Sequence, residues 1–562
     1  MASTSKSGKS QPGRIVEPRE PTKNEELSRL ESIEIAGQVQ ELRADQALAD
    51  LGYEPELSRN RSTFHVAFMS FVLASVPYGL GTSLFYPLIN GGSATVIWGW
   101  VSVSLIIICV ALSLGEITSV YPTAGGVYYQ TFMLSPVRWR RLAAWICGWS
   151  YVAGNVVITL AVGFGTTSFV VACINVFEKE PGVGIFQTQT YHIYLLFLAI
   201  TILCTATSAL GNRHLPKLDA FATFWTLAAL VATAICTLAI AKNGRHSGEY
   251  VFGDFEPLSG WTPGWAFCVG LLQAGYATSS TGMIISMCEE ARDPSTQVPK
   301  AMVGTVMLNT VAGLLFLIPL MFVLPDLDFL VSLASGQPLP SILKSAIGNS
   351  GGAFGLLVPL IVLALICGVG CTTATSRCIY AFARDGGIPA SGWWKQVDRR
   401  LGVPLNALLL SAGVQILLGL IYFGSTAAFN AFSGAGVIFL TVSYAVPIAV
   451  SLFGGRAHVK TGPFYLGAFG TFCNVLALGV YYNFLFRILC HCRALLTNDW
   501  DPVWSCLALP LFCMPSYLPV ARETVNYAPA VFCGVVALAA AWYWAWGQKH
   551  YRGPPVHGAA LG

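Results

Sequence analysis

The feature that most constrains this chain is a succession of about twelve apolar runs, each about 20 residues or longer, which is the length that crosses a bilayer. Only 11% of its 562 residues are charged, against about 25% in soluble domains. We therefore expect an all-α polytopic membrane protein. The predicted spans lie near 66–90, 96–115, 143–175, 192–211, 218–241, 264–288, 301–324, 353–376, 405–423, 429–452, 467–489 and 527–547.

The segments outside these runs are polar. Residues 1–60 contain no apolar core, so we expect a mostly disordered cytosolic tail with a short amphipathic helix within 26–52. The transmembrane domain is expected over 61–547, and a C-terminal tail over 548–562. The 16 cysteines are scattered and the eight histidines fall singly, which indicates neither a zinc site nor a membrane enzyme. Nothing in the sequence points to nucleic acid, and the lipid bilayer is the expected partner.

Basic residues in the loops predict the orientation. Loops on the same side as the N-terminal tail hold fourteen Lys and Arg residues, and the opposite loops hold four. Because Lys and Arg favour the cytosolic side, we expect the N-terminus to lie inside the cell.

Two of the predicted spans contain breaks at mid-membrane depth. In the first span, Pro77 removes a helix hydrogen bond, and Gly79 and Gly81 permit close approach of backbone to a ligand. In the sixth span, Gly275 and Gly282 bracket a run of hydroxyl residues. Such a break survives where it lines a polar cavity. A contact between helices through small residues is the alternative.

The two breaks lie five spans apart. Because five is odd, a second five-span unit enters the membrane inverted relative to the first. Paired breaks in corresponding positions of two halves are typical of a transporter's substrate site. The breaks therefore favour a 5+5 inverted repeat followed by two further helices, with the substrate between spans one and six.

Three segments carry a family resemblance. GEITSVYPTAGGVYYQ (115–130), CEEARDPSTQVPKAM (288–302) and SRCIYAFARDGGIP (376–389) resemble, in order, signatures of the amino acid–polyamine–organocation superfamily. Within it the chain is most similar to the fungal amino acid/choline transporter group, which includes GABA and choline permeases. The resemblance covers roughly 60–547. It implies a leucine-transporter-type fold and proton-coupled uptake at a plasma or organelle membrane, with the plasma membrane expected first and the vacuolar membrane as the alternative.

Backbone dipoles and aromatic rings are the candidate binding groups. A broken helix offers free N–H groups where one half begins and free carbonyls where the other ends; in span six we expect these near Gly282 and Ala274. A ring over an ammonium group contributes about 0.5–2 kcal/mol. The resemblance adds Asn155, a lone amide in span three. We expect substrate contacts from Tyr78, Gly79, Gly81, Thr82, Asn155, Gly275, Tyr276, Thr278, Ser279 and Gly282.

Coupling and gating residues are expected near the cytosolic ends. Glu116 closes span two, and Glu289 and Glu290 close span six. They would relay protons or form gate ion pairs with Arg377, Arg384 or Arg292; we favour the gate for Glu289 and Glu290. Asp219 is a weaker proton-site candidate. In sodium-coupled relatives, hydroxyls at the end of span eight hold an ion, whereas the resemblance to fungal members implies H⁺ and no cofactor. The span-eight candidates are Thr372, Thr373, Ser376 and Arg377.

One stretch departs from the family pattern. Residues 481–508 interrupt the end of span eleven and indicate either an untranslated intron wrongly included in the coding sequence or a lineage-specific loop. The core of ten spans is independent of it. The sequence thus predicts a secondary active transporter of a small amine or amino acid, not an enzyme; a nutrient sensor on the same fold is the alternative, although sensors usually carry a longer ordered cytosolic extension.

Overall fold

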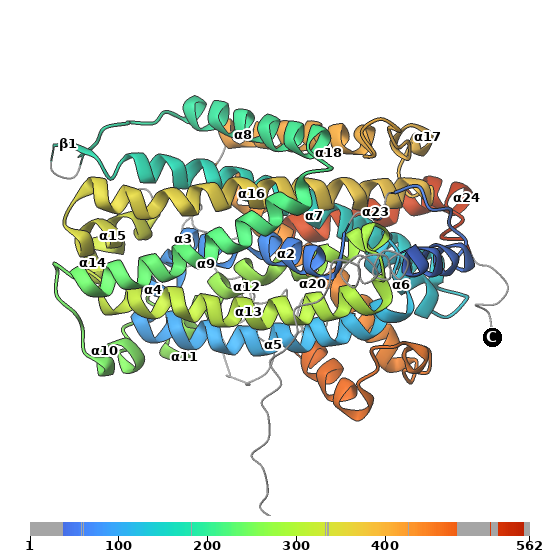
Figure 1. Ribbon diagram of the computed structural model, residues 1–562, viewed down its shortest axis with the longest axis horizontal. Coiled ribbons are helices and arrows are strands. Elements are labelled where there is room, and N and C mark those ends of the chain that lie inside the picture. The colour runs from blue at the N-terminus through green and yellow to red at the C-terminus, as the bar shows by residue number, and fades with distance from the viewer. Residues whose placement is uncertain are drawn as a thin grey trace, which may run out of the picture.

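Long helices run side by side along one axis of this computed structural model (Figure 1). The structure describes residues 38–57, 59, 61–180, 183–331, 333, 336–424, 426–479, 518 and 527–555. Within these residues the only sheet is a two-stranded antiparallel hairpin, β1 (Glu178–Glu180) and β2 (Val183–Gly184), at one end of the bundle. The predicted all-α polytopic fold is confirmed.

The first five spans come in sequence order. Span one is divided into three short helices, and the next four spans are continuous. Their bounds are α2 (Thr63–Ala74), α3 (Val76–Thr82) and α4 (Phe85–Ile89) for span one, then α5 (Gly92–Val120), α7 (Arg140–Ile174), α8 (Thr190–Leu210) and α9 (Leu215–Ile240).

Spans six to ten repeat this plan, with the first of them again divided. Their bounds are α11 (Pro263–Gly270), α12 (Leu272–Thr278) and η1 (Ser279–Glu290) for span six, then α13 (Pro294–Phe322), α16 (Ser350–Arg384), α18 (Leu405–Gly419) and α20 (Thr426–Phe453). Two apolar segments follow, the shorter helix Gly467–Gly479 and the helices α23 (Ala528–Trp542), η3 (Tyr543–Gly547) and α24 (Gln548–His550).

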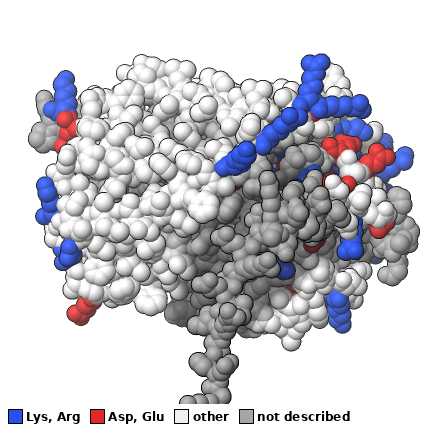
Figure 2. Space-filling model, viewed as in Figure 1, with Lys and Arg blue, Asp and Glu red and all other residues white. Residues whose placement is uncertain are grey.

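Short elements connect the spans at the two ends of the bundle. They are α6 (Gly126–Leu134), α10 (Gly248–Gly253), α14 (Leu327–Val331), α15 (Pro338–Ile347), α17 (Ser391–Trp394), α19 (Ile421–Gly424) and η2 (His458–Thr461). Lys and Arg gather mainly at the end that holds α6, α17 and α24, which we call the basic end (Figures 1 and 2). The flank of the bundle in Figure 2 is almost free of charge, as a surface facing lipid must be.

Ten helices of the described residues are long and apolar enough to cross a membrane. Span six falls outside that number because it changes helix type, and span eleven because its described part is short. Some predicted bounds require correction. The helix α16 continues to Arg384, eight residues beyond the predicted end at 376, because Arg377 and Arg384 are buried in ion pairs rather than placed in water.

Packing between the spans follows the predicted five-span offset. Span one packs against span six, span two against seven, span three against eight and span four against nine. Other contacts also occur in matched pairs: span three packs against ten and span eight against five. When each span of the first half is exchanged for the span five positions later, the same pairs of spans remain in contact. This is the pattern of two inverted halves that face each other across a pseudo-twofold axis.

The N-terminal tail differs from its prediction. Residues 38–50 are helical, and Leu48, Tyr53 and Leu57 are buried against the bundle. The short helix expected within 26–52 is therefore present, but the segment that follows it is not disordered, because apolar residues spaced along it pack against the basic end of the bundle. We call residues 38–61 the N-terminal strap. Residues 1–37 lie outside the described part of the chain.

The C-terminal region also docks on the bundle. The predicted tail begins at 548, but Tyr551 is 1% exposed and its ring lies 5.1 Å from that of Trp145 on α7. The indole N–H of Trp145 donates to the carbonyl of Ala539 at 2.9 Å. This end of the chain therefore covers the basic end of span three. The unusual stretch 481–508 lies outside the described residues.

Candidate functional site

The break in span one follows from Pro77. A proline clashes with the carbonyl four residues earlier and has no N–H to donate to it, and that carbonyl belongs to Leu73. The helix α2 accordingly ends at Ala74, and Ser75 adopts a left-handed conformation with φ of 42° before α3 begins. The freed Leu73 oxygen accepts hydrogen bonds from Ser280 Oγ at 2.9 Å and Cys367 Sγ at 3.7 Å. The break therefore ties span one to spans six and eight.

Span six changes type instead of opening. It is α-helical through Thr278 and then runs for twelve residues as the tighter 3₁₀ helix η1, a change that often marks a hinge. Side-chain hydroxyls donate hydrogen bonds to the carbonyls at the junction. Thr278 donates to the carbonyl of Ala274, and Ser279 donates to that of Tyr276. The prediction of free dipolar ends near Ala274 and Gly282 is therefore wrong, because the helix continues through both positions.

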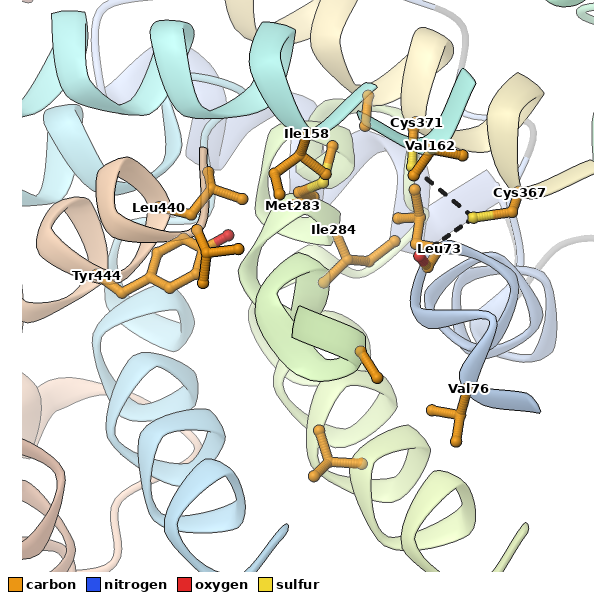
Figure 3. Packing of buried hydrophobic residues seen from close by; sticks show 14 of the residues in the cluster. Leu73, Val76, Ile158, Val162, Met283, Ile284, Cys367, Cys371, Leu440 and Tyr444 are labelled. Carbon is orange, nitrogen blue, oxygen red and sulfur yellow. Dashed lines mark hydrogen bonds between the residues drawn. The ribbon is translucent and has the colours of Figure 1, made fainter. Parts of the chain in front are cut away.

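A small cavity of about 20 Å³ lies where these two spans meet. Four spans contribute to it, and no charged side chain lines it. That is room for about one water molecule, so the wall must move apart to admit a small ligand. Figure 3 shows part of the wall, with Leu73 beside the thiols of Cys367 and Cys371 and with Val162 close by. The lining residues are Leu73, Ala74, Tyr78, Gly79, Ile158, Val162, Tyr276, Ala277, Ser279, Ser280, Cys367 and Cys371.

Four of the predicted substrate residues line this cavity: Tyr78, Gly79, Tyr276 and Ser279. The Tyr78 hydroxyl lies 3.1 Å from Thr166 Oγ1 and donates to the carbonyl of Val162 at 3.2 Å, so its ring is held in place by span three. At Gly79, an added Cβ would lie 3.3 Å from the Cβ of Ala277. The absence of a side chain at Gly79 lets spans one and six approach closely.

The other six predicted substrate residues are not among those that line the cavity. An added Cβ on Gly81 would meet Leu339 at 2.6 Å, and one on Gly282 would meet the Tyr444 ring at 2.6 Å, so these glycines serve helix packing. The side chains of Thr82, Asn155 and Thr278 donate to carbonyls of their own helices. Gly275 directly precedes Tyr276, the first residue of span six that lines the cavity.

Most of the wall was not predicted. Ile158, Val162, Cys367 and Cys371 are apolar or weakly polar residues within long apolar helices, where a lining position has the same pattern as a lipid-facing one. Ser280 lies in the hydroxyl run, and its bond to Leu73 is the detail that sets it apart from its neighbours. Pro77 in span one and the glycine-bracketed hydroxyl run in span six were the signals that pointed to these two spans.

The basic end is closed by a buried ion-pair network. Glu290 accepts from Arg377 at 2.8 Å and from Arg61 at 3.1 Å, and Arg61 also donates to Asp219 at 2.9 Å. All four side chains are at most 7% exposed. The network joins the strap to spans five, six and eight, so these elements cannot separate at the basic end while it is intact.

Glu289 forms a second closure beside it. Its carboxylate accepts two bonds from Arg384, at 2.8 and 3.0 Å, and one from the backbone N–H of Ala124. Thus both span-six carboxylates pair with span-eight arginines, as the gate interpretation expected. Arg292, the third candidate, instead pairs with Glu41 of the strap at 3.2 Å, and both of these side chains are over a third exposed.

The remaining coupling candidates are dispersed. Glu116 pairs with Arg456 after span ten, at 2.5 and 2.6 Å. The hydroxyls of Thr372 and Thr373 donate to carbonyls of their own helix, and Thr373 also meets Ser208 of span four. Ser376 Oγ accepts from Arg377. None of the span-eight hydroxyls at these positions lines the cavity.

A half-buried aspartate at the basic end was missed. Asp385, directly after α16, accepts hydrogen bonds from Tyr53 of the strap at 2.9 Å and from Tyr128 of α6 at 2.8 Å. Burial raises the pKa of the Asp385 carboxyl from 3.8 to about 6, against the lowering effects of Arg384 and the two tyrosine hydroxyls. The Arg384 guanidinium stacks over the Tyr53 ring at 3.9 Å. Asp385 therefore links the strap to the bundle.

In the part of the chain that the structure describes, ten spans in two inverted halves, with a small uncharged cavity at the break of span one, have the architecture of a membrane transporter. The amino acid permease family model matches residues 62–538, and the chain belongs to that family.

Named relatives agree with this class. The chain is 29% identical to the choline transporter of Saccharomyces cerevisiae over 89% of this chain and 83% of that protein. It is 27% identical to the GABA-specific permease of the same yeast, over 91% and 86%, and 27% identical to the amino-acid permease BAT1 of Arabidopsis thaliana, over 91% and 95%. The protein is a multi-pass membrane transporter of amino acids or amines and not an enzyme.

Proposed function

We propose that this chain is a proton-coupled symporter for a small amine of the choline or GABA type, working by alternating access. The observation that carries the proposal is the uncharged cavity between the break of span one and span six. A transporter needs its substrate site between two closures that open in turn. The ion pairs of the basic end supply one such closure.

The cavity wall favours a single positive charge. The carbonyl end of α2 carries the negative end of a helix dipole, and the Tyr78 and Tyr276 rings offer faces to an ammonium group. A second charge on the substrate would be buried without a side-chain partner, which is costly. We place choline first because a quaternary ammonium needs no hydrogen bonds from a largely apolar wall. The name of the yeast choline transporter fits this choice.

Proton coupling would act through the carboxylates at the basic end. Glu290 and Asp219 share Arg61, so protonation of either carboxylate would weaken its bond to that guanidinium and help the basic end to open. This assigns H⁺ as the coupling ion, with no other cofactor. The N-terminus is proposed to be cytosolic and the membrane to be the plasma membrane; the distribution of Lys and Arg supports this orientation.

Uptake by proteoliposomes tests the proposal. The purified full chain is reconstituted, and uptake of radiolabelled choline, GABA and a panel of amino acids is measured with and without an inward proton gradient. We expect saturable choline uptake that the gradient stimulates. Uptake unaffected by the gradient would reject proton coupling, and binding without uptake would favour a nutrient sensor.

Tyr276→Ala examines the site itself. Removing the ring takes away one cation-binding face and one wall of the cavity, so we expect uptake to fall below detection while the protein still reaches the membrane. Tyr276→Phe is the matched control: it keeps the ring face and should retain most uptake. Normal uptake kinetics in Tyr276→Ala would show that the substrate binds elsewhere.

A further inference from the structure

The N-terminal strap is bonded to the ends of two different spans, and the first of these is span eight. The Tyr53 hydroxyl donates to Asp385 at 2.9 Å, and the Tyr380 hydroxyl donates to Glu56 at 2.7 Å. The Arg384 guanidinium covers the Tyr53 ring at 3.9 Å. Tyr380 and Arg384 belong to α16, and Asp385 follows it directly. Side chains therefore hold this part of the strap against the end of span eight.

The second anchor of the strap is the end of span six. Arg59 donates to the carbonyl of Ala291 at 2.7 Å. The backbone of Arg61 pairs in parallel with that of Ala291. The Arg61 N–H donates to the carbonyl of Glu290 at 3.2 Å, and the Arg61 carbonyl accepts from the N–H of Arg292 at 3.2 Å. Because α2 begins shortly after this segment, the anchor joins span six to the start of span one.

The strap cannot keep both anchors when the basic end opens. Glu289 of span six and Arg384 of span eight pair across this end, and an opening must separate them. The anchor on span six includes backbone hydrogen bonds next to span one. The anchor on span eight is made by side chains, and Glu56 is exposed, so water is available to replace the Tyr380 hydroxyl as its partner. The span-eight anchor is therefore the easier one to break.

We propose that the strap is a clasp that travels with spans one and six and is released from span eight each time the basic end opens. Between openings it holds this end closed together with the buried ion pairs. The role of the clasp in transport rests on the proposed function, whereas the unequal strength of the two anchors does not.

Distances between pairs of spin labels test the two anchors separately. Gln46 is exposed on the strap helix. Lys395 is exposed directly after α17, which packs on α16, and Lys300 is exposed on α13, which follows span six. The labelled variant Q46C/K395C therefore reports on the span-eight side, and Q46C/K300C reports on the span-six side. Native cysteines that react with the label in wild type are first replaced by serine.

Tyr53→Phe combined with Tyr380→Phe loosens the span-eight anchor alone, because it removes both hydroxyls and keeps both rings. The full chain is reconstituted in liposomes and measured by pulsed electron paramagnetic resonance. We expect Q46C/K395C to gain a second distance, longer by about 5 Å, the size of a one-turn shift between elements. Q46C/K300C should keep a single distance. If the double substitution prevents folding, Tyr53→Phe alone replaces it.

Two results would overturn the clasp. A longer distance in both labelled variants would show that the strap leaves span six as well as span eight. An unchanged distance in both would show that the two hydroxyls do not hold the strap.

A reversible tether examines the same division during transport. Glu41 and Arg292 form an exposed pair between the strap and the loop after span six, so a bifunctional methanethiosulfonate can join E41C/R292C and dithiothreitol can release it. Q46C/D50C is the matched control, because the side chains of Gln46 and Asp50 are hydrogen-bonded within the strap helix at 3.1 Å. We expect choline uptake by tethered E41C/R292C to stay within about twofold of its uptake after reduction. A larger loss, absent from Q46C/D50C, would show that the strap must leave span six, against the proposal.

The clasp and the proposed substrate fail in different ways. If wild type does not take up choline, the substrate is wrong, and the spin-label distances still decide how the strap is held. If choline is carried but Q46C/K395C keeps a single distance in the Tyr53→Phe and Tyr380→Phe background, the clasp alone is refuted.

Discussion

The same spans are held together by neutral contacts around the cavity and by ion pairs at the basic end. Around the cavity, spans one, six and eight meet through hydroxyls, thiols, aromatic rings and a freed carbonyl, with no charged side chain in the wall. At the basic end the same spans meet through buried carboxylates and guanidinium groups. Neutral contacts exchange easily for contacts with a substrate. Buried ion pairs resist the loss of one partner, because the remaining charge has no water around it.

The largest effect is expected at the basic end. Glu290→Gln leaves Arg61 and Arg377 buried, with Asp219 as the only carboxylate that contacts Arg61 in the described residues. Breaking a buried pair from one side costs about 3–5 kcal/mol. We expect a strongly lowered midpoint of thermal unfolding in detergent micelles and little protein in the membrane. A midpoint near that of wild type would mean that the network does not close this end.

Asp385 allows the comparison to be sharpened by pH. Its folded-state pKa of about 6 lies above its ordinary value of 3.8, so the folded protein retains a proton between those values that the unfolded chain has lost. The stability contributed by this proton is complete below about pH 4 and declines as the pH rises through 6. At 1.36 kcal/mol for each pKa unit, the loss is at most about 3 kcal/mol.

Asp385→Asn should remove that decline. The groups that face the carboxyl are Arg384, Glu289, Tyr53, Tyr128 and Tyr551. Thermal unfolding of wild type and variant between pH 4.5 and 7.5 measures the difference, in which the titration of the other carboxylates cancels. Parallel curves for the two proteins would assign the pH dependence to another group.

The two regions also differed in how far they could be predicted. Pro77 predicted the break in span one because a proline leaves one specific carbonyl without its helical hydrogen bond. Opposite charges at the ends of spans six and eight predicted the ion pairs between these spans. The strap could not be predicted to dock: Tyr53 and Glu56 bond to Asp385 and Tyr380, more than 320 residues away. In span six, Gly275 and Gly282 suggested an opening, but three of the four hydroxyls between them bond to their own helix. The fourth, that of Ser280, bonds to span one.

Gly282→Ala tests how tightly neutral contacts close the region beside the cavity. The added Cβ would lie 2.6 Å from the Tyr444 ring, inside a fully packed contact between spans six and ten. Overpacking of this kind costs about 1–3 kcal/mol. We expect a moderately lowered unfolding midpoint. Gly304→Ala is the control, because nothing lies within 4 Å of its added Cβ, and it should leave the midpoint unchanged. Equal effects would trace the loss to the helix backbone and not to the contact.

The smallest effect is expected for an ion pair of the basic end that is exposed to solvent. Arg292 and Glu41 join the strap to the start of the loop after span six at 3.2 Å, with side chains 44% and 37% exposed. Water solvates either charge when its partner is lost, so an exposed pair contributes about 0–1 kcal/mol. Glu41→Gln should therefore shift the unfolding midpoint far less than Glu290→Gln, and added salt should reduce even that shift. If the two substitutions destabilise the protein equally, burial is not what gives the network its strength, and the contrast between the neutral cavity and the charged end loses its physical basis.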